Sequence, residues 1–327
     1  MSTDLMEWLL GKDNPSVRYF TLRELLHKSE NGIEVKEARK AIMTTGPVPK
    51  ILAYQKPEGH WGNPEDFYVR SKYKGTVWSF LLLAQLGADG KDSRIVKARD
   101  AILRLSQDPK SGGFSHRGTE KAGGNPEGII PCLTGNMLWS MLKFGYADHP
   151  GVKKGLDFIT TYMRFDDGVE KAPKGWPYER YKQCWGTHTC HMGCFKMLKA
   201  LSAIPLTRRS SRVKELIEEG TEHFLKHRIF KRSSDPSRVA KAKWLRLSFP
   251  YLWQYDVLEV LNTLADLGCR DERMHAAIRL VFSKRQDDGR YLLEETYNGR
   301  FLTVIEPKGK PSKWLTMLAM RMLNALS

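Results

Sequence analysis

The sequence lacks the features of a membrane or secreted protein. No run within the 327 residues approaches the roughly 18 consecutive apolar residues that a membrane-spanning helix needs. The segment from Met1 to Leu10 carries acidic residues and no basic stretch of the kind that opens a secretory signal. Cysteine is scarce, with five residues, and without such a signal it does not indicate a disulfide framework. We therefore expect a cytoplasmic protein without a transmembrane segment.

Motifs for nucleic-acid binding are also missing, although positive charge is in excess. The net charge is +16, and residues 208–246 hold twelve Lys or Arg against five Asp or Glu. No helix-turn-helix or zinc-finger spacing occurs. A basic surface can attract nucleic acid, anionic lipid or a diphosphate-bearing substrate, and an ordinary solvated helix face is the alternative.

A repeat is present along the chain. In each copy an apolar segment ends in Gly, an amphipathic segment follows, and a turn rich in Gln, Asp and Gly closes the unit. Gly87, Gly145 and Gly268 end three apolar segments, and a weaker copy spans 188–228. Segments apolar on all sides are typical of buried helices, and one-faced segments of outer helices. The repeat predicts an all-α protein, an α/α toroid of inner and outer helices from about five to six helical hairpins.

The repeat also suggests a division of the chain. We expect residues 1–46 to form N-terminal helices that pack on the toroid and residues 47–327 to form the repeat domain. Asn14 followed by Pro15 is a typical helix start, since Asn caps the free N–H groups and Pro suits the first helical position.

One turn carries a family resemblance. The sequence Gln55-Lys-Pro-Glu-Gly-His-Trp61 has the Gln, Gly and Trp spacing of a known repeat turn, and 107–114 and 286–291 are looser versions. The chain therefore resembles the terpenoid cyclases and protein prenyltransferase β-subunits, the superfamily of the prenyltransferase/squalene-cyclase repeat. The resemblance implies a toroid with a central apolar cavity and an isoprenoid or other lipid-like ligand.

The chain departs from that family at its catalytic motifs. Squalene-type cyclases use an Asp-x-Asp-Asp motif and protein prenyltransferases an Asp-x-Cys zinc pair, and neither motif occurs here. The leading hypothesis is a metal-dependent transferase or cyclase. The alternatives are a non-catalytic toroid with a structural metal site and a basic partner-binding face, and a protein that binds nucleic acid through the basic face.

Cysteine and histidine cluster in residues 183–194. The repeat places this segment and Cys132 at the starts of neighbouring inner helices, so they should meet at one rim. Thiolate and imidazole are the ligands that zinc prefers. A four-cysteine iron–sulfur site through Cys132, Cys184, Cys190 and Cys194 is an alternative, as are plain packing cysteines. His191 and Cys194 are reserve zinc ligands. The preferred zinc ligands are Cys132, Cys184, His188 and Cys190.

Further candidates lie at other turns and helix starts. Asp256 is a candidate catalytic acid, since a carboxyl group in an apolar setting can have a raised pKa. Aromatic side chains could line the cavity and stabilise a cation, and basic ones could meet an anionic head group. The candidate ligand-binding residues are Tyr251, Trp253, Tyr255, His116 and Arg117.

Overall fold

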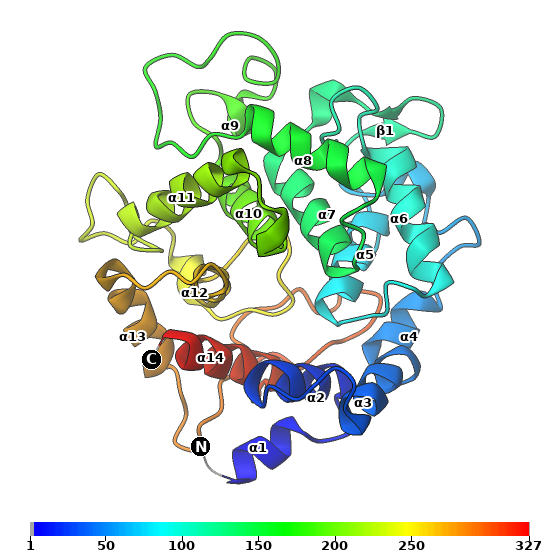
Figure 1. Ribbon diagram of the computed structural model, residues 1–327, viewed down its shortest axis with the longest axis vertical. Helices are drawn as coiled ribbons and strands as arrows, with labels where there is room; N and C mark the ends of the chain where they lie inside the picture. The colour runs from blue at the N-terminus through cyan, green and yellow to red at the C-terminus, as the bar shows by residue number, and fades with distance from the viewer. Residues whose placement is uncertain (1–2, 327) are drawn as a thin grey trace.

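The computed structural model describes residues 3–326. The apolar and the amphipathic segments that alternate along the chain are both helical in it (Figure 1). The inner helices are α2 (Pro15–Phe20), α5 (Thr76–Gln85), α7 (Pro131–Lys143), α10 (His191–Ser202), α12 (Val257–Asp266) and α14 (Lys313–Leu326). The outer helices are α1 (Thr3–Leu9), α3 (Ile33–Thr44), α6 (Ser93–Ser106), α8 (Pro150–Tyr162), α11 (Ser211–Lys226) and α13 (His275–Ser283). The short elements are α4 (Pro47–Leu52), α9 (Lys182–Trp185), and β1 (Gly118–Thr119), which pairs antiparallel with β2 (Gly123–Gly124).

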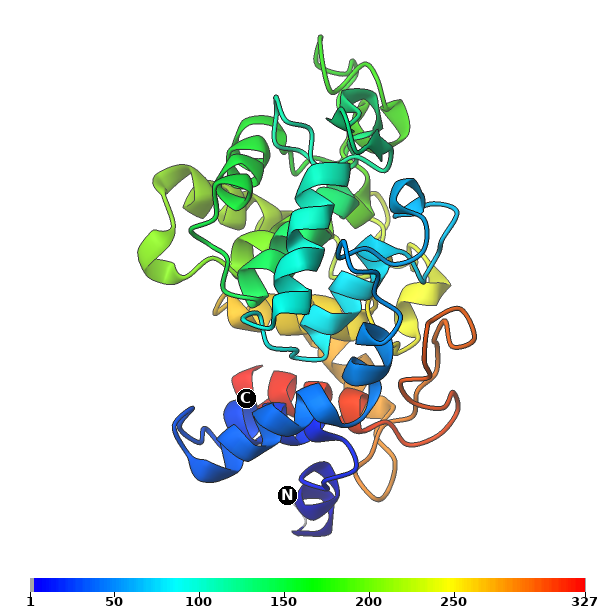
Figure 2. The ribbon, with the colours of Figure 1, turned by 90° about the vertical axis from the view of Figure 1, so that its right-hand side faces the viewer.

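The inner helices form a closed ring. Around it α5 packs on α7, α7 on α10, α10 on α12, α12 on α14 and α14 on α2. The Ser16 hydroxyl donates to the Leu86 carbonyl over 2.7 Å, which ties α2 to the end of α5 and closes the circle. Figures 1 and 2 show the ring from its open face and from the side.

Each inner helix has an outer partner. The pairs are α5 with α6, α7 with α8, α10 with α11, α12 with α13, α2 with α3, and α14 with α1, so helices from the two ends of the chain complete the sixth pair. The predicted all-α toroid is confirmed. The predicted boundary after residue 46 falls between α3 and α4 and stays a prediction, while α2 and α3 take part in the ring as one hairpin.

Burial explains the two layers. All ten residues of α5 are buried, whereas α6 buries only one face, as the apolar and amphipathic patterns predict. Gly87, Gly145 and Gly268 have φ angles of 75°, 85° and 74°, the left-handed conformation that ends a helix with least strain in glycine. These glycines stop the inner helices and turn the chain outward.

The Gln-containing turns fasten successive units together. The Gln107 amide donates to the Gly112 carbonyl over 2.9 Å and to the Gly151 carbonyl over 2.7 Å. The second bond reaches the first turn of α8. Gln55 does the same in its own turn, with donation to Gly59 and to Arg94 at the start of α6. The motif is thus a side-chain link between a turn and the next outer helix.

We expect Gln107→Ala to lower the free energy of unfolding by about 1–3 kcal/mol, because two acceptors would lose a buried donor. Urea denaturation measures the change. Gln286→Ala is the matched control, since the exposed Gln286 side chain donates only to the nearby Lys284 carbonyl. Equal losses from the two variants would contradict a linking role for Gln107.

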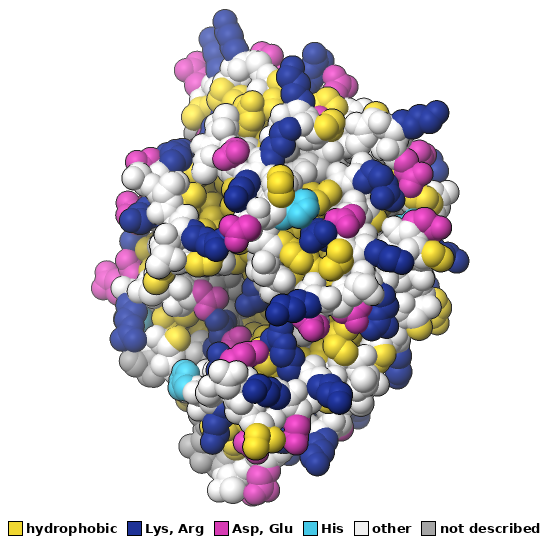
Figure 3. All heavy atoms as spheres, turned by 45° about the vertical axis from the view of Figure 1, so that its right-hand side comes forward, with side chains coloured by type: hydrophobic (Ala, Val, Ile, Leu, Met, Phe, Trp, Pro, Cys, Tyr) yellow, Lys and Arg dark blue, Asp and Glu magenta, His cyan; other side chains and the backbone are white. Residues whose placement is uncertain are grey.

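Charge is spread over the surface. Figure 3 shows basic and acidic side chains interspersed on the face that it presents, without a continuous patch of one sign. In the described part of the basic segment, Arg212 pairs with Glu215 and Glu219 at 3.1 and 3.0 Å. Within residues 3–326, no helix has the length and apolar character needed to cross a membrane.

Candidate functional site

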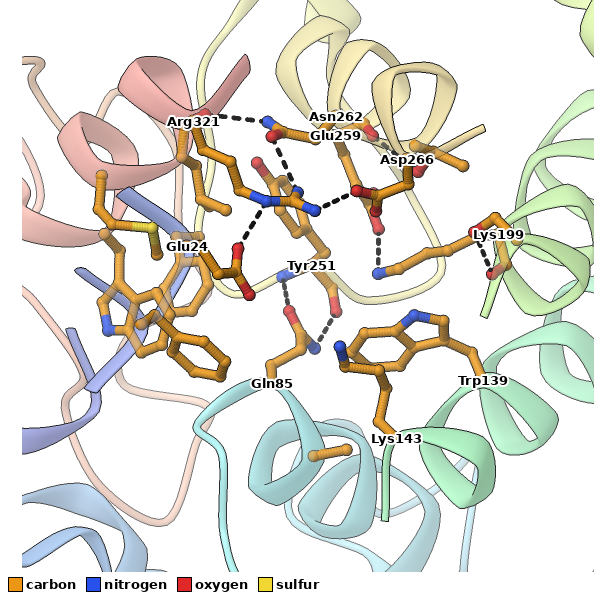
Figure 4. A pocket seen from close by; sticks show the side chains of 18 residues that line it. Glu24, Gln85, Trp139, Lys143, Lys199, Tyr251, Glu259, Asn262, Asp266 and Arg321 are labelled. Carbon is orange, nitrogen blue, oxygen red and sulfur yellow. Dashed lines mark hydrogen bonds and ion pairs between the residues drawn. The ribbon is translucent and has the colours of Figure 1, made fainter. Parts of the chain in front are cut away.

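The inner helices surround a cavity of about 110 Å³ near the C-terminal ends of α5, α7, α10 and α12 (Figure 4). Aromatic side chains form part of the wall: Phe20, Trp139, Phe249, Tyr251 and Trp314. Charged side chains also line it: Glu24, Lys143, Lys199, Glu259, Asp266 and Arg321. A central cavity is therefore present, and charged side chains of the inner helices interrupt its apolar lining.

Glu259 is the centre of a buried charge cluster. The Lys196 amine lies 2.9 and 2.8 Å from the two Glu259 oxygens, and the Lys199 amine lies 2.7 Å from one of them. Glu259 is 3% exposed and Lys196 1%. Burial lowers the pKa of Lys196 to about 8, although Glu259 opposes the shift. Two lysines of α10 thus share one carboxylate of α12.

Arg321 organises the other charges of the cavity. It pairs with Glu24 at 2.5 Å and with Asp266, and it donates to the Asn262 side-chain oxygen over 3.0 Å. Figure 4 shows this guanidinium reaching across the cavity from α14. Each of the three cavity carboxylates therefore faces a cation.

The aromatic wall is stacked and braced. Phe249 and Trp314 lie parallel with ring centroids 4.3 Å apart and an interplanar angle of 15°. The Lys199 amine lies 3.9 Å from the centroid of Trp139, in the range of a cation–π contact. The Gln85 side chain holds Tyr251 in place, with donation to the Tyr251 carbonyl over 2.7 Å and acceptance from its N–H over 2.8 Å.

Two cavity groups lack partners in the described chain. The Tyr251 hydroxyl is buried and makes no hydrogen bond with another described residue. Lys143, at the last residue of α7, lines the cavity with an exposed side chain, and no ion pair joins it to the described carboxylates. The cavity therefore offers a free cation to a bound molecule, whereas the Tyr251 hydroxyl is enclosed in the wall.

Asp256 lies outside the lining of this cavity. It caps α12, where its carboxylate accepts from the Glu259 N–H over 2.9 Å and from the Ser248 N–H and hydroxyl over 2.6 and 2.9 Å. Burial raises the pKa of Asp256 to about 7. Its geometry is that of a helix cap, and its assignment as a catalytic acid stays a prediction.

The other predicted ligand-binding residues separate into three places. Tyr251 lines the central cavity. Tyr255 is buried and stacks on Trp244 with centroids 4.8 Å apart. Trp253 lies with His116 and Arg117 on a surface groove of about 760 Å³. Both ring nitrogens of His116 are buried without a partner in the described residues.

The three cysteines that the repeat register placed together do interact. A hydrogen bond between Cys184 and Cys190 holds the pKa of Cys184 well above its usual range and lowers that of Cys190. Burial raises the pKa of Cys132 to about 12, and the nearby Cys190 adds to the shift. Tyr68, which lines the same groove as His116, hydrogen-bonds to Cys132. This cluster lies at the N-terminal ends of α7 and α10, at the other end of the ring from the central cavity.

His188 lies in different surroundings from these thiols. It is exposed and lines a pocket of about 280 Å³ with His191, His223 and His227. Nitrogen atoms of these last three residues, one from each, lie within 4.8 Å of one another, so they form a group that could hold a metal ion. Of the three, only His191 was considered a ligand from the sequence. The missed signal was the four-residue spacing of His223 and His227, which places both on one side of the C-terminal end of α11.

Charge and burial set the protonation of this histidine group. Burial lowers the pKa of His223 to about 4 and that of His191 well below its usual value, and neighbouring histidines add to both shifts. Burial acts against ionisation of Asp167, yet hydrogen bonds with Lys226 and His227 lower its pKa to about 2. Neutral imidazole and ionised carboxylate are the metal-binding forms of these groups.

No family model and no curated protein sequence matches the chain. Among solved structures, it is similar to the type II terpene cyclase MstE from Scytonema, with 15% identity, coverage of 95% of this chain and 87% of that one, and a TM-score of 0.46. It is also similar to a protein from Actinoplanes, at 16% identity, 88% and 75% coverage and a TM-score of 0.48. A GH76 α-mannanase from Bacteroides thetaiotaomicron follows at 14% identity, 76% and 67% coverage and a TM-score of 0.41.

These structures include the cyclase family that the sequence resembles. Their identities and TM-scores are low, however, and one fold hosts many functions. The likenesses therefore carry no argument about activity, which has to be argued from the sites themselves.

Proposed function

We propose that the central cavity binds a small ligand with an anionic group and a short apolar portion, of the isoprenoid or lipid-like class. The observation that carries the proposal is the combination, in one cavity, of the stacked Phe249 and Trp314 rings with the unpaired Lys143 amine. The rings would contact the apolar portion, and Lys143 would pair with the anion.

The cavity volume limits the size of this ligand. A cavity of roughly 150 Å³ in another protein holds a molecule the size of benzene, and this one measures about 110 Å³. A five-carbon isoprenoid unit is of that order. One structure of the Scytonema cyclase contains the much longer geranylgeranyl dihydroxybenzoate, which would not fit within the cavity described here. A longer chain would have to extend through the mouth beside Lys143.

The charges favour binding over proton-initiated cyclisation. That chemistry needs an acid in contact with the substrate, and the three cavity carboxylates are paired with Lys196, Lys199 and Arg321. A metal-dependent transferase or cyclase reaction would need an ion supplied next to this cavity. We therefore propose a ligand-binding function first.

Titration calorimetry with dimethylallyl diphosphate tests the proposal. Lys143→Met should raise the Kd about tenfold to a hundredfold, since a hydrogen bond to a charged group contributes about 1.5–3 kcal/mol. Lys153→Met is the matched control, because Lys153 is an exposed lysine on α8 outside the cavity. Dimethylallyl alcohol, which lacks the anion, should bind weakly to all forms.

Two results would overturn this proposal. One is equal weakening by the two lysine variants, which would point to general charge attraction by this basic protein. The other is the absence of binding by both compounds to the wild-type protein.

A second candidate function is that of a toroid with a structural zinc ion at the cysteine cluster. It is favoured by the interaction of Cys132, Cys184 and Cys190, which come from two neighbouring hairpins. Zinc bound by these thiols would tie the hairpins together and add its binding free energy to folding. His188, the fourth predicted ligand, lies in the histidine pocket. It would have to move to bind the same zinc ion as the three thiols.

A further inference from the structure

A second potential metal-binding group lies between α10 and α11. His191 begins α10, His223 lies in the last turn of α11, and His227 is the residue that caps its C-terminal end. Asp167 comes from the loop after α8. His223 Nε2 is 3.0 Å from His191 Nδ1. His227 Nε2 is 2.5 Å from Asp167 Oδ1, and His223 Nδ1 is 3.8 Å from the same oxygen. Segments separated by up to 60 residues thus place three imidazoles and a carboxylate together.

His227 is held in place by two contacts. Its Nδ1 lies 3.1 Å from the Lys231 carbonyl, and its Nε2 lies 2.5 Å from Asp167 Oδ1. One of its ring nitrogens lies within 4.8 Å of a ring nitrogen of His191 and of one of His223, so three imidazoles converge on one point.

His191 gives an independent indication. Its Nε2 is buried and has no hydrogen-bond partner in the described chain. Whichever ring nitrogen carries the proton, Nε2 is left either as an unused donor or as an unused acceptor, and an unpaired buried polar atom is costly. A ligand atom placed at this nitrogen would remove that cost.

We propose that His191, His223, His227 and Asp167 form a site for a divalent metal ion of the zinc type. Imidazole nitrogen and carboxylate oxygen suit zinc and its first-row neighbours. Lys226 holds the other Asp167 oxygen at 2.6 Å, which fixes the carboxylate toward the rings. The site is separate from the cysteine cluster and from the central cavity, and it does not depend on ligand binding there.

The surroundings leave room for a further ligand of the metal. The group opens on the pocket of about 280 Å³, which Arg232, Ser233 and His188 also line. Water or an anionic oxygen, such as that of a carboxylate or phosphate, could occupy this side, because Arg232 supplies a positive charge. Three protein ligands with an open fourth position are typical of reactive zinc sites, whereas four protein ligands are typical of closed ones.

Cobalt spectroscopy on the full chain can separate this site from a thiolate site. The protein is stripped with a chelator and titrated with Co²⁺ and then Zn²⁺. Cobalt bound by nitrogen and oxygen shows only weak visible bands, whereas cobalt bound by cysteine adds an intense thiolate charge-transfer band. We expect the first spectrum, displaced by zinc, and a loss of affinity of more than about a hundredfold in His223→Asn and His227→Asn, since even outer-shell changes cost tenfold to a hundredfold.

Two control variants show whether the bound metal belongs to the histidines or to the cysteines. His275→Asn alters an exposed histidine of α13 and should leave the spectrum unchanged, as should a Cys132→Ser, Cys184→Ser double variant. Metal that survives both His223→Asn and His227→Asn, or that disappears only with the cysteines, would overturn the histidine site. A wild-type protein that binds no Co²⁺ or Zn²⁺ would overturn it as well.

A measurement on the wild-type protein tests the site even if the variants do not fold. Zinc should shift the imidazole NMR signals of a minority of the nine histidines. His275, in α13, and His27, near the N-terminus, lie outside the site, and their signals should not shift. Shifts spread over all histidines, or none, would contradict the site. Binding of dimethylallyl diphosphate is measured separately, so failure of one proposal leaves the other testable.

Discussion

Glu259→Gln should lower the free energy of unfolding by about 3–5 kcal/mol, the usual cost of removing one partner from a buried ion pair. Lys196 and Lys199 would remain next to a neutral amide, and Lys196 is almost completely shielded from water. Guanidinium denaturation at neutral pH measures the loss. Among single substitutions in the cavity, this one removes the charge with the largest number of close cationic partners.

The control for Glu259 is an exposed ion pair. Asp148→Asn breaks the contact with Arg208, in which both side chains are at least half exposed, and should cost no more than about 1 kcal/mol. Adding Lys196→Met to Glu259→Gln should recover part of the loss, because one unpaired charge disappears. If Glu259→Gln cost no more than Asp148→Asn, the cluster would not contribute to stability as its burial indicates.

The parts of the fold that local signals encode could be predicted from the sequence. Gly87, Gly145 and Gly268 stop helices by their own backbone conformation, and Gln55 and Gln107 bond within short segments and to the next helix. The pairing of α1 with α14 has no such signal. It joins opposite ends of the chain and depends on closure of the ring.

The candidate sites were less predictable for a related reason. The repeat register correctly brought Cys132 toward Cys184 and Cys190, since equivalent positions of neighbouring hairpins adjoin. The same reasoning looked for the cavity at the starts of the inner helices, where the conspicuous motifs lie. Lys199 and Glu259 lie inside helices and closer to the other end. From the sequence, a charged residue within a helix is interpreted as solvent-exposed, because its ion-pair partner lies on another helix and is known only from the packing.

The histidine group shows the same limit. His223 and His227 fall in the basic segment that the sequence suggested as a solvated or partner-binding face. Their meeting with His191 and Asp167 requires α10, α11 and the loop after α8 to be placed in space. The contacts that bring particular histidines together come from packing, which the residue types alone do not specify.

Asp256→Asn should make the stability of the protein less dependent on pH. Burial raises the pKa of Asp256 from the ordinary 3.8 to about 7 in the folded chain, so the folded state binds this proton more tightly than the unfolded state does. The stabilisation from the protonated group is complete below about pH 4 and is lost as the pH rises to about 7. Three pK units correspond to about 4 kcal/mol. Asparagine keeps the helix cap and does not titrate.

The measurement is the unfolding free energy of the wild type minus that of Asp256→Asn, taken by urea denaturation from pH 4 to pH 8. The difference should fall as the pH rises, by up to about 4 kcal/mol, while titrations of other residues cancel. Glu306→Gln should show the same sign, because burial also raises the pKa of Glu306 to about 7. A difference that instead grows with pH would mean that the Ser248 and Glu259 donors stabilise an ionised Asp256 more than burial opposes it. The carboxylate would then be a charged helix cap throughout the neutral range, and not a group that gains a proton on folding.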